Sequence, residues 1–135
     1  MLESKMKTIL INKNNVNRQI IQLHGSQDFS GMMESIELNA NSFYEFTSEN
    51  GFVLLCGMGK ECCIIQFSHI NGEPPYDVAI SPIPLSIDGE VIFYIDNTPT
   101  EIPSELCIST ECAFDIIKYF LDYAKKFPSV EWQEI

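Results

Sequence analysis

Basic residues are scarce in this 135-residue chain: eight Lys and Arg stand against 19 Asp and Glu, which gives a formal net charge of −11. Between Arg18 and Lys118 the only basic residue is Lys60, while fifteen acidic residues are spread through the same stretch. Such a surface repels phosphates and anionic lipids and attracts cations. We therefore expect no nucleic acid and no membrane partner. Two interpretations of the negative charge stay open: the surface is well solvated and has no partner, or it binds a cationic protein.

Long apolar runs are also missing. No run approaches the roughly 20 residues that a membrane-spanning helix requires, and the first seven residues lack the apolar segment of a signal peptide. We therefore expect a cytoplasmic protein. The hydrophobic fraction of 45% and the nine Phe exclude a disordered acidic tail. The length is typical of one domain, so we expect a single domain over residues 1–135.

Cysteine and histidine show no metal-binding spacing. The five cysteines include no CxxC pair, and the adjacent Cys62 and Cys63 would point to opposite faces of a strand. Neither His24 nor His69 lies at zinc-ligand spacing from a cysteine pair. An odd cysteine count argues against a disulfide framework. We expect all five to be small core residues, and we expect no metal and no other cofactor.

The familiar catalytic motifs are absent: the sequence contains no HExxH, no GxSxG and no phosphate-binding GxxxxGK loop. The run 57–60, Gly-Met-Gly-Lys, lacks that last spacing and is interpreted as a turn. Neighbouring acids such as Glu101 and Glu105 lie in polar surroundings, whereas a general acid needs burial or a partner to tune its pKa. We expect no catalytic residues and a protein that is not an enzyme, with a small enzyme as the third possibility.

Short β-type runs separated by turn signals fill most of the chain. Asn50-Gly51 and Asp88-Gly89 are strong turn signals, and Pro82 and Pro84 confine their stretch to a sheet edge or a loop. The segment around Ile20 is of uncertain type. The predicted strands are Thr8–Ile11, Phe43–Thr47, Phe52–Cys56, Cys62–Phe67, Tyr76–Ile80 and Glu90–Ile95. Tight turns between consecutive strands favour an antiparallel meander.

A long helix is predicted over Glu111–Lys126. Ser109 or Thr110 can cap its start, the two lysines at its end complement the helix dipole, and Pro128 is expected to end it. Its apolar stripe at helical spacing consists of Ala113, Ile116, Ile117, Phe120, Leu121 and Ala124.

A shorter helix is predicted over Phe29–Leu38, with Ser26 as its N-cap. Together these elements predict an α+β fold: an antiparallel β-meander sheet with a long C-terminal helix packed on one face and a short N-terminal helix. Trp132, the only Trp, is expected to tie the C-terminal segment to the core.

The C-terminal third of the chain carries a family pattern. Residues 108–113 read Ile-Ser-Thr-Glu-Cys-Ala and lead into the apolar helix, and residues 127–132 read Phe-Pro-Ser-Val-Glu-Trp. This pattern resembles immunity protein family one of bacterial polymorphic toxin systems, whose members have a helix beginning near a Glu-Ala pair and a Pro-x-x-(Val/Ile)-x-Trp tail. Here Cys112 separates Glu111 from Ala113, and residues 125–127, Lys-Lys-Phe, stand where members usually have a glycine before the proline.

The resemblance implies an inhibitor that binds a cognate secreted toxin, often a nuclease or a nucleic acid deaminase, and blocks its active site. A cationic nucleic-acid cleft would be complementary to an acidic domain. We expect the toxin to contact acids that are predicted to lie in loops: Glu73, Asp77, Asp88, Glu90, Asp96, Glu101 and Glu105. For each of them the alternative is an ordinary solvated acid.

For the whole protein, the alternative is an acidic adaptor module in an intracellular protein complex. Such a module would bind through an exposed apolar patch and would depend little on salt. We expect a monomer or a weak dimer in either case. The identity of the toxin does not follow from these residues.

Overall fold

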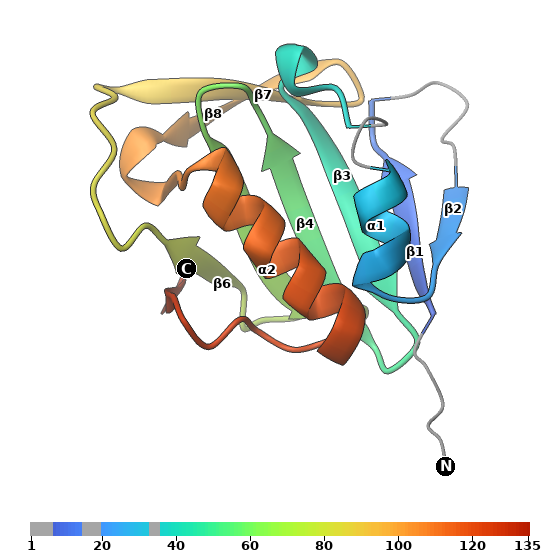
Figure 1. Cartoon of the computed structure of the whole chain (residues 1–135). Coiled ribbons are helices and arrows are strands. Elements are labelled where there is room, and N and C mark those ends of the chain that lie inside the picture. The colour runs from blue at the N-terminus through green and yellow to red at the C-terminus, as the bar shows by residue number, and fades with distance from the viewer. Residues whose placement is uncertain (1–6, 15–19, 33–35) are drawn as a thin grey trace.

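The computed structural model describes residues 7–14, 20–32 and 36–135, and within them nine strands form one sheet. Helix α2 (Thr110–Tyr123) crosses one face of the sheet, and α1 (Ser26–Met32) lies on the same face beside it (Figure 1). The predicted α+β class is confirmed. The strands are β1 (Thr8–Asn12), β2 (Ile20–Leu23), β3 (Ser42–Ser48), β4 (Phe52–Met58), β5 (Cys63–His69), β6 (Asp77–Ile80), β7 (Glu90–Ile95), β8 (Thr98–Pro103) and β9 (Glu131–Glu134).

The strand order is β2-β1-β3-β4-β5-β6-β9, and the run β3 to β6 is the predicted meander. Neighbours along this path pair antiparallel. Strands β7 and β8 form a hairpin off this path, and β7 joins β3 by one parallel pair, Ser42 with Tyr94. The segment around Ile20, of uncertain type in the sequence, is strand β2 and pairs with β1.

Side chains at alternate positions of the strands point toward the helices and form a core beneath them. We call this core the helix-side core. In β3, Tyr44 and Phe46 point toward α2, whereas Glu45 between them points to the opposite face. The rings of Phe67 and Phe120 meet edge to face, with centroids 6.0 Å apart. The largest side chains buried here are Leu23, Phe29, Tyr44, Phe46, Leu54, Met58, Ile65, Ile108, Ile116, Ile117 and Phe120. Burying these aliphatic and aromatic groups is the main stabilising term of the fold.

Helix α2 begins as predicted and ends earlier. Ser109 is its N-cap, and the Ser109 Oγ accepts a hydrogen bond from the backbone N–H of Cys112 at 3.1 Å. The predictions that Pro128 ends the helix and that the two lysines lie in its last turn are wrong. The helix ends at Tyr123 because buried Ala124 adopts a left-handed conformation (φ 53°) and its N–H binds the carbonyl of Phe120. Alanine at this position is not a recognisable stop signal, since glycine usually occupies it.

Helix α1 begins earlier than predicted, with Ser26 inside its first turn. The backbone N–H of Ser26 donates to the Asp122 carboxylate of α2 at 2.9 Å, a contact between residues 96 positions apart. That partner could not be read from the local sequence. The last described residue of α1 is Met32, and the predicted continuation through residues 33–35 lies outside the described residues. Leu38, the expected last residue, begins a short 3₁₀ helix, η2 (Leu38–Ala40).

The C-terminal strand β9 pairs with β6 and brings Trp132 onto the helix-side core. The Trp132 indole is half-buried, its ring lies 6.2 Å from that of Phe67, and its Nε1–H donates to the carbonyl of Phe127 at 3.0 Å. The expectation that Trp132 ties this segment to the core is confirmed. Four of the five cysteines are buried, Cys112 is half-buried, and all are free thiols.

Candidate functional site

The β7–β8 hairpin packs on the sheet face opposite α2, at one end of the sheet (Figure 1). Phe93 of β7 is fully buried, with its ring 5.8 Å from that of Phe43. Gly57 permits this close approach, since a Cβ there would lie 2.8 Å from Ile64 and 3.0 Å from Phe93. The second core thus formed consists of Phe43, Cys62, Ile64, Val78, Phe93 and Cys107. It holds the hairpin firmly on the sheet.

Polar contacts secure both sides of the hairpin. The Asn41 side chain donates to the carbonyl of Ile92, and the N–H of Tyr94 donates to the carbonyl of Asn41, both at 2.9 Å. The turn at Asp96 and Asn97 has positive φ at both residues, 50° and 64°, which is the geometry of a tight two-residue hairpin turn. The N–H of Asn97 donates to the Asn14 side chain at 2.8 Å. The outward side of the hairpin is therefore held in a fixed orientation.

The side of the hairpin turned away from the sheet combines apolar and acidic side chains. Ile92 and Tyr94 are 42% and 37% exposed, although they sit in the middle of a strand. The register places Glu101 directly opposite Ile92. We call this surface the hairpin outer face, and it consists of Glu90, Ile92, Tyr94, Pro99, Glu101 and Pro103. Exposed apolar side chains with a polar rim are typical of protein-binding surfaces.

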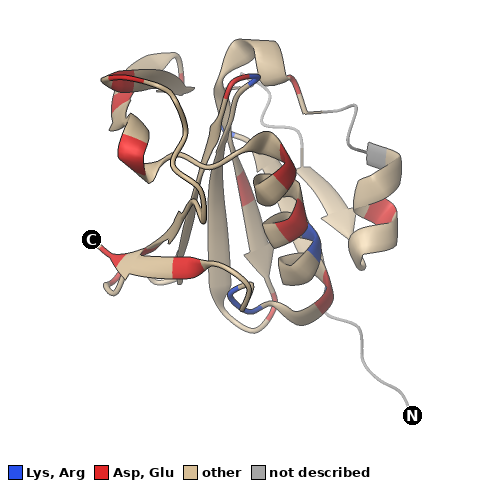
Figure 2. Cartoon of the chain, turned by 60° about the vertical axis from the view of Figure 1, so that its left-hand side comes forward, with Lys and Arg blue, Asp and Glu red and all other residues tan. Residues whose placement is uncertain are grey.

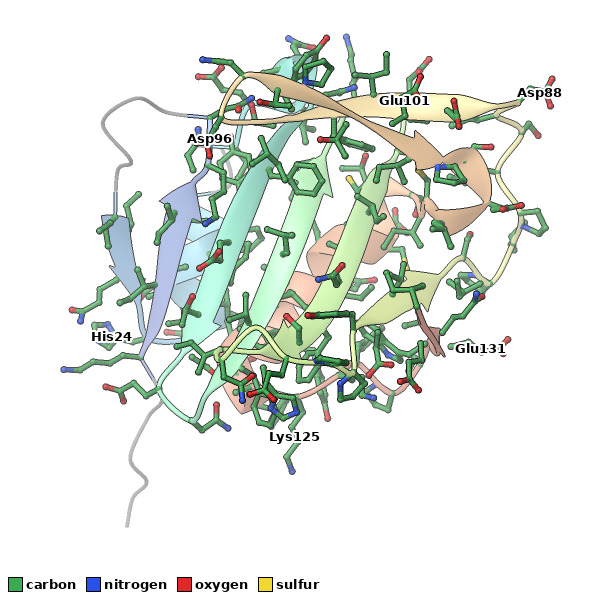
Figure 3. The ribbon with its side chains drawn as sticks, turned by 180° about the vertical axis from the view of Figure 1, so that it is seen from behind. His24, Asp88, Asp96, Glu101, Lys125 and Glu131 are labelled. Atoms are coloured by element: carbon green, nitrogen blue, oxygen red, sulfur yellow. The ribbon has the colours of Figure 1, made fainter. Side chains whose placement is uncertain are left out.

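Five of the seven predicted acids belong to the hairpin and the segments at its ends. Figure 3 shows Asp88 and Asp96 at opposite ends of the hairpin, with Glu101 between them. Glu105 lies in the short 3₁₀ helix η3 (Ser104–Leu106), which begins beside the Asp88–Gly89 turn because the N–H of Ser104 donates to the carbonyl of Gly89 at 2.9 Å. The fifth acid, Glu90, starts β7.

The other two predicted acids are not part of this surface. Glu73 is exposed in the β5–β6 connection, and Asp77 starts β6. Asp77 is already paired, with its Oδ2 3.0 Å from the Nζ of Lys126. The prediction that all seven acids lie in loops is wrong for Asp77, Glu90 and Glu101, which are strand residues. Strand β8 was not predicted because its two prolines disfavour strands away from a sheet edge.

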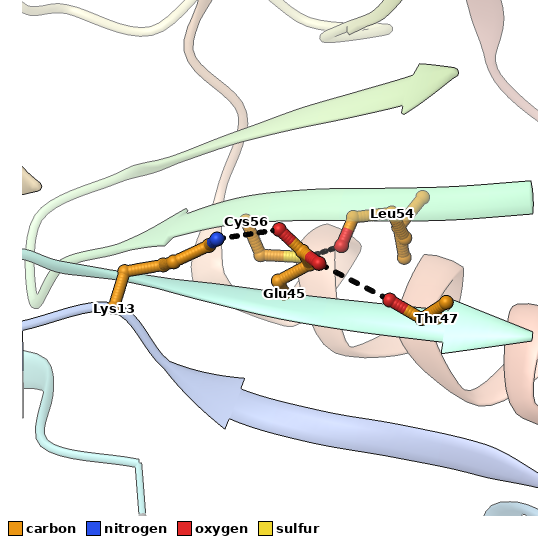
Figure 4. A network of polar contacts seen from close by, with 5 residues as sticks. All are labelled: Lys13, Glu45, Thr47, Leu54 and Cys56. Carbon is orange, nitrogen blue, oxygen red and sulfur yellow. Dashed lines mark hydrogen bonds and ion pairs between the residues drawn. The ribbon is translucent and has the colours of Figure 1, made fainter. Parts of the chain in front are cut away.

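Acids on the hairpin differ from the acid in the middle of the sheet. On β3, the Glu45 carboxylate lies 2.8 Å from the Nζ of Lys13 and accepts a hydrogen bond from Thr47 (Figure 4). In the described residues, Glu90 and Glu101 have no such ion pair. From residue 61 to residue 117 the sequence has neither Lys nor Arg, and Figure 2 shows this part of the surface with acids only. The hairpin outer face therefore offers unneutralised carboxylates to a partner.

The ligand clusters and the cysteine thiols of the described residues do not favour metal binding or thiol catalysis. No group of three or more His, Cys, Asp or Glu there could hold a metal ion. Burial raises the pKa of the Cys56 thiol well above its usual value, and burial likewise raises that of Cys63. Such thiols are protonated at neutral pH and make poor nucleophiles. A hydrogen bond with Cys107 lowers the pKa of Cys62, but Cys62 is buried in the second core.

Sequence reasoning missed the two apolar residues at the centre of the hairpin outer face. Residues 90–95 read Glu-Val-Ile-Phe-Tyr-Ile, and this run has no apolar–polar alternation to distinguish the exposed Ile92 and Tyr94 from the buried Phe93. The Asp96–Asn97 pair was the one available signal, because both residues tolerate positive φ.

The chain has no match among models of known protein families or among curated proteins. No helix in the described residues is long and apolar enough to span a membrane. Functional inference therefore depends on the hairpin outer face and on the C-terminal sequence pattern.

Proposed function

We propose that this protein is an immunity protein that binds a cognate toxin domain through the hairpin outer face and blocks its active site. The observation that carries the proposal is the exposed pair Ile92 and Tyr94, flanked by Glu90 and Glu101 in a stretch without any basic residue. The C-terminal resemblance to immunity protein family one supports it. The toxin in this proposal has a cationic cleft, as a nuclease or a nucleic acid deaminase does.

The two kinds of side chain on the hairpin outer face would have separate roles in binding. Carboxylates steer a cationic partner and can raise association to about 10⁸–10⁹ M⁻¹s⁻¹ at low salt. Ile92 and Tyr94 bury apolar area at the centre of the contact, which slows dissociation. Because the hairpin is held by its second core and by Asn41, little conformational entropy is lost on binding.

The acidic adaptor module is the second candidate, and the same exposed pair, Ile92 and Tyr94, favours it. The two candidates differ in their dependence on salt. A cationic toxin should associate markedly more slowly as salt rises from low to physiological, because the Debye length then falls to about 8 Å. An adaptor that binds through its apolar centre should associate at nearly the same rate.

The first experiment co-expresses the protein with the toxin domain encoded by the neighbouring gene, scores survival and measures association at several salt concentrations. The Glu90→Lys/Glu101→Lys variant should lose protection. The matched control is Glu49→Lys/Glu131→Lys, which makes the same charge change at exposed acids of the β3–β4 turn and of β9. If the wild-type protein neither binds nor protects against that toxin, the immunity proposal fails and the adaptor becomes the first candidate.

A second variant tests the apolar centre. Ile92→Ser/Tyr94→Ser should weaken binding by about tenfold or more, as removal of central interface residues does. Ile70→Ser is the control, because Ile70 is 60% exposed after β5, outside the hairpin. Equal affinities of the two variants for the toxin would place the interface elsewhere on the molecule.

A further inference from the structure

The segment after α2 runs past the sheet at the end away from the β7–β8 hairpin (Figure 1). A groove lies there between this segment and strands β4 to β6. Its volume is about 310 Å³, which is in the range of ligand pockets in proteins. The aromatic rings of Phe52 and Phe67 line it and lie 5.1 Å apart. His69, Pro75 and Lys126 add to the lining. The groove is thus mainly apolar and aromatic, with a few charged groups.

One of the two lysines that line this groove already contacts both an aromatic ring and a carboxylate. The Nζ of Lys126 is 5.9 Å from the ring centroid of Phe67 and 3.0 Å from Oδ2 of Asp77. An aromatic face together with a carboxylate is the usual environment of a bound ammonium or guanidinium group. The Asp77 side chain is only 15% exposed, whereas that of Lys126 is 42% exposed. The carboxylate is therefore the fixed part of the site, and the lysine is the part that can leave.

Charges around the groove are balanced while Lys126 contacts Asp77. The register of β6 and β9 places Glu134 directly opposite Asp77, so two carboxylates are cross-strand neighbours on one face. Lys126 pairs with Asp77. The other lysine at the groove, Lys125, is exposed and extends away from the sheet (Figure 3). Once Lys126 leaves Asp77, Lys125 is the one lysine at the groove beside two neighbouring carboxylates, and the local charge is then complementary to a cationic ligand.

We propose that this groove binds an arginine side chain of a partner protein, which displaces Lys126 from Asp77. A guanidinium group can form two parallel hydrogen bonds with one carboxylate and can stack on an aromatic ring, and an ammonium group cannot do both. The exchange costs little on the lysine side, because the 42% exposed Lys126 side chain can return to solvent and the guanidinium takes its place at Asp77. This site is separate from the hairpin outer face, and it does not depend on the partner being a toxin.

A small arginine compound tests the site without any partner. We would titrate the ¹⁵N-labelled full chain with N-acetyl-arginine N-methylamide and follow backbone amides by NMR. The citrulline analogue, in which a neutral urea replaces the guanidinium, is the reference. The arginine compound should shift the amides of Phe67, Ser68, Tyr76 and Asp77 saturably, and the citrulline analogue should not. Equal shifts with both compounds, or shifts spread over all surface acids, would overturn the proposal.

Two variants should change the affinity for the arginine compound in opposite directions. Lys126→Ala removes the internal competitor and should tighten binding of the arginine compound about threefold, the order expected for loss of one exposed cation contact. Asp77→Asn should weaken binding about fivefold or more, by the strength of a charge-assisted hydrogen bond. Lys118→Ala and Asp88→Asn, which change charge elsewhere, should leave affinity unchanged.

Weaker binding by the Lys126→Ala variant would contradict displacement, because Lys126 would then be part of the binding site. Unchanged affinity in Asp77→Asn would contradict the site itself. Thermal melts establish that each variant is folded. If Asp77→Asn does not fold, Glu134→Gln replaces it, with an expected loss of about twofold because its carboxylate contributes only a nearby charge; no loss in that variant would also count against the site.

Discussion

The helix-side core and the hairpin outer face arise from the same kind of strand and differ in what covers them. In β3 and β5 the apolar residues that alternate toward α2 are closed off from solvent by α2 itself. In β7, Ile92 and Tyr94 alternate in the same way, and no described element covers them. Strand geometry produces the alternation of faces, and only the tertiary arrangement decides whether an apolar side chain contributes to stability or remains available for binding.

Acidic residues of the main sheet and of the hairpin outer face also differ in their partners. Near the centre of the sheet, Glu45 is neutralised by Lys13, and at the start of β6 Asp77 is neutralised by Lys126. On the hairpin outer face, Glu90 and Glu101 have no counterion among the described residues. Stability and the proposed binding thus depend on different residues, so variants in the two regions should separate them.

The largest effect should come from truncating the helix-side core. Phe120→Ala removes a fully buried ring that packs against Phe67, and should lower the free energy of unfolding by about 4 kcal/mol. Urea denaturation followed by circular dichroism measures this. A loss below about 1 kcal/mol would mean that α2 contributes little to the core, contrary to its burial.

Alkaline pH should weaken the same core. Burial raises the pKa of Cys56 and Cys63 in the folded state above the ordinary value of 9.0, so both thiols are protonated in the folded and unfolded states below pH 9 and stability is complete there. Above pH 9 the unfolded state releases protons that the folded state retains, and each such thiol lowers the free energy of unfolding by about 1.4 kcal/mol per pH unit.

The loss at pH 10 should therefore reach about 1.4 kcal/mol from Cys56, whose pKa is raised well above its ordinary value, with a smaller contribution from Cys63. Denaturant titrations between pH 7 and pH 10 measure it. Cys56→Ala should start from a lower stability and show a shallower dependence on pH. A pH dependence identical to that of the wild-type protein would show that Cys56 does not contribute to it.

An effect smaller than that of Phe120→Ala is expected at the junction of the two regions. Gly57→Ala would place a Cβ 2.8 Å from Ile64, 3.0 Å from Phe93 and 3.1 Å from Phe43, so Ile64 must move and the two rings must give way slightly. Overpacking of this kind costs about 2 kcal/mol. Thermal unfolding measures the cost, and ¹⁵N spectra should show the changes concentrated on β3, β5 and β7. Changes concentrated on α2 instead would mean that the two cores are mechanically coupled.

The smallest effect on stability is expected on the hairpin outer face. Ile92→Ser/Tyr94→Ser removes exposed side chains and should change the free energy of unfolding by no more than about 0.5 kcal/mol per residue. The melting temperature should stay close to that of the wild-type protein. A large drop would show that these residues support the hairpin, and the comparison between a stabilising and a binding region would no longer hold.

Much of the fold could be predicted because strong local signals lie where the structure uses them. Asn50-Gly51 forms a hairpin turn, with Gly51 at φ 94°, and the apolar stripe of α2 is buried as its spacing indicates. The failures have separate causes. The start of α1 depends on Asp122, which is 96 positions away. Helix α2 ends at an alanine in a left-handed conformation, and β8 contains two prolines that disfavour a strand.

The candidate site was predicted in part. Charge indicated an acidic surface, and the structure brings Asp88, Glu90, Asp96, Glu101 and Glu105 to the hairpin and its ends. The distribution of charge along the sequence could not indicate that Asp77 is paired with Lys126. These two residues are far apart in sequence and come together only in the folded chain. Exposure of Ile92 and Tyr94 is likewise a property of the assembled sheet.

The pairing of β6 with β9 has a consequence for the order of folding. Strands β3 to β5 join through short turns and can form early, whereas Asp77 and Glu134 are separated by a long stretch of chain that includes α2. Closing such a long loop is entropically unfavourable, and non-local pairs form late. We expect the amides of β9 to exchange with deuterium faster than those of β4. Local unfolding at this edge would then expose Asp77, in the groove that we propose binds arginine, while the hairpin outer face stays intact.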